Sequence, residues 1–213
     1  DDTIAPQPEL TDKQKEIAAT GELTISVQKR EHDYLIDIVI PDRSGLLSLV
    51  SGVLNVLRLD VRSARTKTVS ECAVMQWVVI ADPHAPEITE EILKREITLA
   101  TEDIRSLAER IQSRINAYAT LPTIPVPAPV VETFTDGATD ATIIEIRTHD
   151  RPALLFNIGD VITQCNVDIR SAIVTTLGAE AIDTLYLREF GGGALVSQRV
   201  EEVSNKVKAA LLK

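Results

Sequence analysis

Two short turns contain residue types that could bind a small charged molecule. Residues 42–47 read Asp-Arg-Ser-Gly-Leu-Leu, residues 150–155 read Asp-Arg-Pro-Ala-Leu-Leu, and apolar residues at helical spacing follow. The first N–H groups of a helix lack partners within the helix and lie at the positive end of its dipole, so an amino acid's α-carboxylate can bind there. Asp42 would then face the ligand's ammonium group, and Gly45, without a side chain, would permit close approach.

The predicted ligand-binding residues are those of the two turns: Asp42, Arg43, Ser44, Gly45, Leu46, Leu47, Asp150, Arg151, Pro152, Ala153 and Leu154. A structural alternative stays open, because Asp42 or Ser44, and Asp150 in the second turn, would also suit the N-cap of the following helix. The turns differ in one dipeptide, Ser44-Gly45 against Pro152-Ala153. Gly45 can adopt a positive φ, whereas Pro152 stiffens the loop and Ala153 adds a methyl group, so we expect tighter binding at the first turn.

Two further polar pairs follow the turns at matching distances. Arg62-Ser63 and Arg170-Ser171 lie on predicted strands, where they could line an interface or form structural salt bridges, and we favour the structural role. Asp60 and Asp168 precede them at the junction of helix and strand, where aspartate is more typical of a turn than of a ligand site.

No pattern indicates catalysis. The pairs His32-Asp33 and His149-Asp150 would need further ligands to hold a metal, and the only other histidine, His84, lies in a predicted loop. The sequence contains no phosphate-binding loop, GxSxG motif or Cys/His nucleophile pair. We therefore expect no catalytic residue, no metal site and no cofactor in this chain.

The two turns belong to a tandem duplication. Laying residues 42–68 over residues 150–176 without a gap gives ten identities in 27 positions, including the Asp-aliphatic-Arg-Ser-Ala block in both copies. Such an internal repeat predicts two units of the same fold.

Each unit has the element order of an α+β, ferredoxin-like fold, in which we expect an antiparallel sheet with its helices on one face. In the first unit, residues 34–40 predict a buried strand, the turn and a helix follow, and residues 61–69 and 73–81 predict two more strands. Residues 22–28 predict a strand that forms a hairpin with residues 34–40, as residues 130–135 do with residues 142–148. The second unit ends with a helix around residues 194–212, so the closing strand of each antiparallel sheet must be the one that precedes the unit.

The domain boundaries follow from these elements. We expect an N-terminal tail or linker over residues 1–21, a first domain over residues 22–118, a proline-rich linker over residues 119–129 and a second domain over residues 130–213. Residues 88–100 and 102–118 predict two helices, so the first domain has one extra helix.

Composition excludes several classes of function. A net charge of −10 argues against nucleic acid as a partner. No secretory signal and no apolar run of membrane-spanning length is present, so we expect a cytoplasmic protein without membrane contact. Cys72 and Cys165 fall in different units and are expected to be buried thiols. The chain begins at Asp1 without methionine, which suggests a fragment of a longer protein.

The repeated motifs resemble a known family. A strand ending in Asp-Arg-(Pro/Ser)-(Gly/Ala)-Leu-Leu, a helix and then Asp-(Val/Ile)-Arg-Ser-Ala resemble an ACT domain, and residues 22–213 resemble the tandem ACT domains at the C-terminus of bacterial PII uridylyltransferase/uridylyl-removing enzymes. Residues 168–183 are the most specific part of this match. In actinobacterial relatives the transferred group would be adenylyl.

The resemblance implies a regulatory role in nitrogen metabolism. It implies that the chain binds an amino acid, glutamine in this family, at its ACT domains and allosterically controls attached nucleotidyltransferase and nucleotidyl-removing domains, with PII as an indirect partner. It also implies pairing of ACT domains within one chain or between chains. An alternative is a free-standing ACT-repeat regulator that acts through protein contacts.

Overall fold

The computed structural model describes residues 11–69, 71–118, 127–136 and 140–212. The first unit consists of β1 (Thr24–Lys29), β2 (Tyr34–Pro41), α2 (Leu46–Val56), β3 (Leu59–Val69), β4 (Cys72–Ala81), α3 (Glu90–Glu102) and α4 (Ile104–Tyr118). The second consists of β5 (Val130–Asp136), β6 (Ala141–His149), α5 (Leu154–Gln164), β7 (Val167–Leu177), β8 (Glu180–Glu189) and α6 (Ser197–Leu211). None of the helices in these ranges is long and apolar enough to cross a membrane.

Each unit is closed by the strand that precedes it, as predicted. β1 pairs antiparallel with β2, and β5 pairs antiparallel with β6 from Val130 opposite Arg147 to Asp136 opposite Ala141. The strand order β1-β2-β4-β3 in the first unit is matched by β5-β6-β8-β7 in the second. The α+β, ferredoxin-like fold with a permuted closing strand is therefore confirmed.

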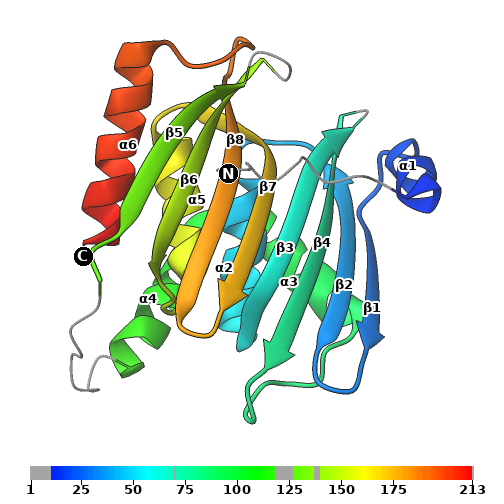
Figure 1. The fold of residues 1–213 in the computed structure, drawn as a ribbon. Helices are drawn as coiled ribbons and strands as arrows, with labels where there is room; N and C mark the ends of the chain where they lie inside the picture. Colours follow the sequence, from blue (N-terminus) through cyan, green and yellow to red (C-terminus); the bar gives the residue numbers. More distant parts are fainter. Residues whose placement is uncertain (1–10, 70, 119–126, 137–139, 213) are drawn as a thin grey trace.

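The two units share one sheet (Figure 1). β3 and β7 pair antiparallel from Ser63 opposite Thr175 to Lys67 opposite Ser171, and this joins all eight strands in the order β1-β2-β4-β3-β7-β8-β6-β5. The expected pairing of the units therefore occurs within the chain. It removes the exposed edges that β3 and β7 would otherwise present.

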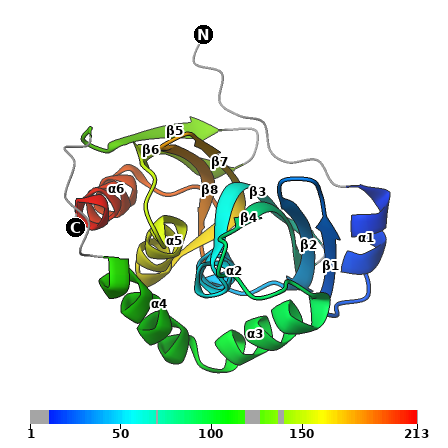
Figure 2. The ribbon, with the colours of Figure 1, turned by 90° about the horizontal axis from the view of Figure 1, so that it is seen from below.

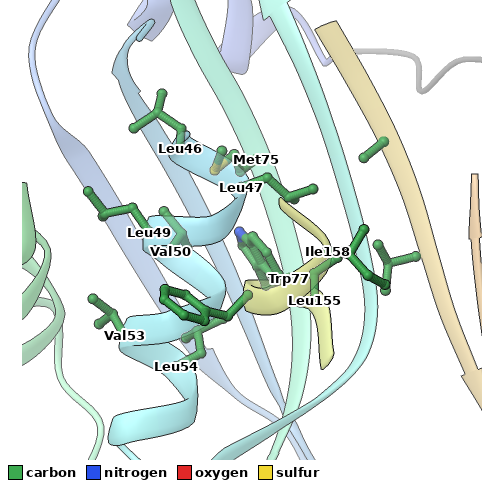
Figure 3. Packing of buried hydrophobic residues seen from close by; sticks show 14 of the residues in the cluster. Leu46, Leu47, Leu49, Val50, Val53, Leu54, Met75, Trp77, Leu155 and Ile158 are labelled. Atoms are coloured by element: carbon green, nitrogen blue, oxygen red, sulfur yellow. The ribbon is translucent and has the colours of Figure 1, made fainter. Parts of the chain in front are cut away.

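Helix α2 lies at the centre of the core (Figure 3). Its apolar side chains form one buried cluster with Met75 and Trp77 of β4 and with Leu155 and Ile158 of α5. α2 and α5 come from different units, so the hydrophobic core crosses the boundary between them. The Ser48 hydroxyl of α2 also donates a hydrogen bond of 3.0 Å to the backbone carbonyl of Phe156.

One helix, which precedes the first unit, lies on the other face of the sheet from the helices of the two units. Helix α1 (Asp12–Ala18) begins with a capping box formed by Thr11 and Gln14. Its Ala18 packs against Val39, Cys72 and Val74, and Figure 2 shows it across the sheet from the other helices. Cys72 of β4 is thus a buried free thiol that packs beneath α1. Cys165, directly after α5, is a buried free thiol as well.

The extra helix of the first unit is present. α3 and α4 follow β4, and α2 packs against both of them. The buried carboxylate of Glu96 on α3 joins the two helices through Arg110 at 2.9 Å. Of the predicted linker over residues 119–129, residues 119–126 lie outside the described residues, as do residues 1–10 of the predicted tail.

Candidate ligand site between the two units

Neither predicted turn uses a side chain as its helix cap. The N-cap residues are Gly45 and Ala153, both in the left-handed region with φ of 82° and 60°, and neither helix has a side-chain cap hydrogen bond. The expectation that Asp42, Ser44 or Asp150 caps the following helix is therefore wrong. The two aspartates directly follow their strands, and their backbone N–H groups donate hydrogen bonds to the carbonyls of Glu71 and Ala179. Their carboxylates remain available for other contacts.

Two cavities related by the internal repeat lie at the boundary between the units. Each is lined by the turn of one unit and by the end of a helix and the start of a strand from the other unit. All thirteen residues that line the smaller cavity have a counterpart 108 positions away that lines the larger one. The duplication has thus produced two equivalent positions for a ligand, both at an interface.

The larger cavity, of about 280 Å³, lies at the turn of the second unit. The predicted site residues Asp150, Arg151, Pro152, Ala153 and Leu154 all line it. From the first unit, α2 contributes Ser51 and Asn55, and β3 contributes residues 59–61. The cavity therefore depends on the contact between the two units.

This cavity can receive both charged ends of an amino acid. The first helical hydrogen bond of α5 runs from the Asn157 N–H to the Ala153 carbonyl, so the N–H groups of Leu155 and Phe156, two residues that line the cavity, have no partner within the helix. These amides could bind a carboxylate. Acidic side chains, including Asp150, lie in the same cavity and could bind an ammonium group.

The electrostatics of Asp150 follow from burial and from the neighbouring unit. Burial raises the pKa of its carboxyl, Arg62 opposes this shift, and Asp60 adds to it. Arg62 and Asp60 both belong to β3, so charges of the first unit act on the pKa of a carboxyl group in the second. Arg151 lowers the pKa of Asp150 through a backbone hydrogen bond, while its guanidinium donates a 3.0 Å hydrogen bond to the Ala210 carbonyl.

The Arg-Ser pairs lie at the interface. The register shifts at Arg62 in β3 and at Arg170 in β7, and such β-bulges redirect the side chain of the extra residue. Arg170 Nη1 lies 3.6 Å from Asp42 Oδ2 of the first unit, while Arg62 acts on Asp150 of the second. For Arg170 the two roles that were considered, lining an interface and forming an ion pair, thus coincide.

The smaller cavity, of about 20 Å³, is nearly filled. The predicted residues Asp42, Arg43, Gly45, Leu46 and Leu47 line it, whereas the exposed Ser44 lines neither cavity. The two volumes favour the reverse of the expected order of affinity: the second turn, not the first, has space for a ligand.

Sequence analysis missed four polar residues of the larger cavity: Ser51, Asn55, Thr176 and Asp183. Asp60 also lines it, although the sequence favoured a turn role, and Asp168 occupies the equivalent place in the smaller cavity. Aligning the two repeats could have identified Asp183. It occupies the position of Met75 in the first unit, and an acidic residue at a buried strand position is unusual. Among the described residues, no group of three or more His, Cys, Asp and Glu side chains is placed to hold a metal ion.

The fold and the repeated interface site define a tandem pair of ACT-type domains. The family model for the ACT-like domain of plant bHLH transcription factors matches residues 23–102. The chain is 30% identical over 185 residues, 82% of its length, to the bifunctional uridylyltransferase/uridylyl-removing enzyme of Streptomyces coelicolor. It is 28% identical to enzymes of the same name from Ruegeria pomeroyi and Acinetobacter baumannii, over 71% and 83% of its length.

The chain spans about a fifth of the length of these relatives: 22%, 17% and 20%. The likeness therefore concerns one part of a larger protein in each case. It supports the resemblance found in the repeated motifs: this chain is a pair of ACT-type domains similar to part of the uridylyltransferase/uridylyl-removing enzymes.

Proposed function

We propose that this chain is an amino-acid-sensing regulatory module, with glutamine as its ligand, that controls attached nucleotidyltransferase and nucleotidyl-removing domains acting on PII. The observation that carries this proposal is the cavity of about 280 Å³ between the units, which offers helix N–H groups for a carboxylate and acidic groups for an ammonium. The names of the relatives in the three bacteria support the choice of the controlled enzyme.

The position of the cavity supports regulation rather than storage or transport. Asn55 and Asp60 come from the first unit and Asp150 from the second, so a bound molecule contacts both units. A ligand that prefers one arrangement of the units shifts the population of that arrangement, and attached domains can respond to the change.

The binding half of the proposal is tested by calorimetric titration of the chain with the twenty amino acids. Glutamine should bind, and at one hundred times its dissociation constant it should stabilise the fold by roughly 2.7 kcal/mol in thermal or urea unfolding. Binding of a different amino acid would transfer the site to that ligand. No binding by any of the twenty would refute the sensing function.

The attachment is tested by the reading frame upstream of Asp1. We expect it to encode a nucleotidyltransferase motif and an HD-type domain. A start codon immediately upstream would instead support a free-standing ACT-repeat regulator, and the amino-acid titration would still test sensing by this chain.

A further inference from the structure

The two equivalent cavities differ most at one strand position of the sheet. In the smaller cavity this position is Met75 of β4, which is 2% exposed and belongs to the hydrophobic core. In the larger cavity it is Asp183 of β8, which is 1% exposed. A flexible thioether that fills space has thus been replaced by a short carboxyl group, and the cavity with the carboxyl group is the open one.

Two polar atoms beside this cavity lack hydrogen-bond partners. Within the part of the chain that the structure describes, Asp183 Oδ1 and Asn55 Oδ1 are both buried and unpaired. The residues opposite Asp183 on the neighbouring strands, Ile146 and Val174, are apolar. Leaving buried polar groups unpaired costs about 1–3 kcal/mol each, so a partner that enters the cavity would recover this energy. Both atoms are acceptors when Asp183 is ionised, so the partner must be a donor.

The charges around Asp183 favour a cationic donor. Asp150 from the turn lines the same cavity, and burial followed by the Asp150 charge raises the pKa of Asp183 to about 7. β3 contributes Asp60 and Arg62, which act on Asp150 with opposite signs, and His149 at the end of β6 lowers the pKa of Asp150. Arg151 in the turn is directed to the Ala210 carbonyl.

We propose that Asp183, together with Asp150, binds the ammonium group of the ligand in the larger cavity, and that ligand binding expels the proton that Asp183 holds in the free protein. This inference rests on the proposed function and names the groups that make the site selective for an amino-bearing ligand. Asn55 accepts a further hydrogen bond from the same end of the ligand. The smaller cavity stays empty, since it lacks the volume for a ligand and has Met75 in place of the carboxyl group of Asp183.

The proton balance follows from the charges. The ammonium group enters already protonated and replaces the proton on Asp183, which leaves to solvent. Binding is therefore weaker below neutral pH, because a larger fraction of Asp183 is then protonated and the ligand must displace that proton. With one linked carboxyl group that titrates near pH 7, the dissociation constant should rise about tenfold between pH 8 and pH 6, with nearly one proton released per ligand at pH 6.

The test is calorimetric titration at pH 6, 7 and 8 in pairs of buffers with different protonation enthalpies, which counts the protons released. The ligand is glutamine, or whichever amino acid binds in the panel above. Wild-type protein should show the pH dependence and proton release just described. Asp183→Asn should bind at least tenfold more weakly at pH 8 and show no pH dependence. Asp160→Asn is the matched control: Asp160 is on α5, burial raises the pKa of its carboxyl, and it lines neither cavity, so this variant should behave as wild type.

A second comparison needs no variant. Glutaramate, which is glutamine without the α-amino group, should bind wild-type protein at least tenfold more weakly and without proton release. Should Asp183→Asn retain wild-type affinity and pH dependence, or glutaramate bind as well as glutamine, this inference is wrong while the sensing function stands. If no amino acid binds but methylammonium binds through Asp183, the inference holds and the sensing function is wrong. If neither binds, both are wrong.

Discussion

At the scale of single residues, the feature that departs most from a stable core is Asp183. A carboxyl group that is 1% exposed and has an unpaired oxygen destabilises the folded state, and the first unit shows that methionine is accommodated at the same position. Proteins tolerate such costs where function requires them. The cost should therefore be measurable as well as the binding.

Asp183→Asn should change how stability depends on pH. The pKa of Asp183 is raised to about 7 in the folded protein, so the folded state holds the proton more tightly than the unfolded chain does. Its contribution is fully present below the unfolded pKa of about 4 and is lost as pH rises to about 7. Between pH 5 and pH 8, wild type should lose about 2–4 kcal/mol relative to Asp183→Asn, from roughly two pKa units at 1.36 kcal/mol each.

Urea unfolding of both proteins at pH 5 and pH 8 measures this difference, and the subtraction cancels the other titrating groups. Parallel stability changes in the two proteins would show that Asp183 is ionised and compensated in the folded state, and would contradict the account of its environment.

At the scale of elements, the contact between α2 and α5 sets the distance between the units. A Cβ atom added at Gly159 of α5 would lie 3.0 Å from Ser48 Cβ and 3.1 Å from the Ser48 backbone nitrogen. The backbone of a packed helix cannot yield without moving the helix, so the absence of a side chain at Gly159 allows the close approach.

Gly159→Ala should therefore destabilise the protein by about 1–3 kcal/mol, the usual cost of overpacking, although alanine has the better helix propensity. Gly191→Ala is a suitable control, because Gly191 has no positive φ and no atom lies within 4 Å of its added Cβ. Urea unfolding of both variants gives the comparison. Equal stability of Gly159→Ala and wild type would mean that the helices can separate at little cost.

The elements were predictable from the sequence, and the site was predictable only in part. Alternation and helical spacing indicated the strands and helices of both repeats, and the hairpin strand that precedes each unit indicated the permuted closure. The turn at Asp150 was also indicated. Asn55 and Asp60 could not be placed beside it, since that depends on the pairing of β3 with β7, which no local pattern specifies.

The predicted caps failed for a local reason. Gly45 and Ala153 adopt positive φ, and this displaces the preceding aspartates from the cap position. Alanine rarely takes this conformation, so nothing in the sequence at Ala153 signalled it.

At the scale of the whole molecule, one sheet and one core connect the two units. β3–β7 pairing and the contact of α2 with α5 join them, so neither unit has a complete core by itself. The chain should accordingly unfold as one cooperative body rather than as two domains.

The single tryptophan permits a direct test of cooperativity. Trp77 is fully buried in the first unit, so its fluorescence reports on that unit, whereas far-ultraviolet circular dichroism reports on both. The two urea transitions should coincide. A fluorescence midpoint separate from the dichroism midpoint would show that the units unfold independently.

The central claim is that an amino acid binds between the units at the second turn, and affinities of two single variants test it most directly. Asp42→Ala and Asp150→Ala remove equivalent carboxylates from the two turns, and Asp42 lies at the cavity of about 20 Å³. Calorimetric titration with glutamine should show binding 10- to 100-fold weaker for Asp150→Ala, the loss expected for a contact between charged groups, and unchanged binding for Asp42→Ala. Weaker binding by Asp42→Ala alone would place the sensor in the first unit and contradict the account.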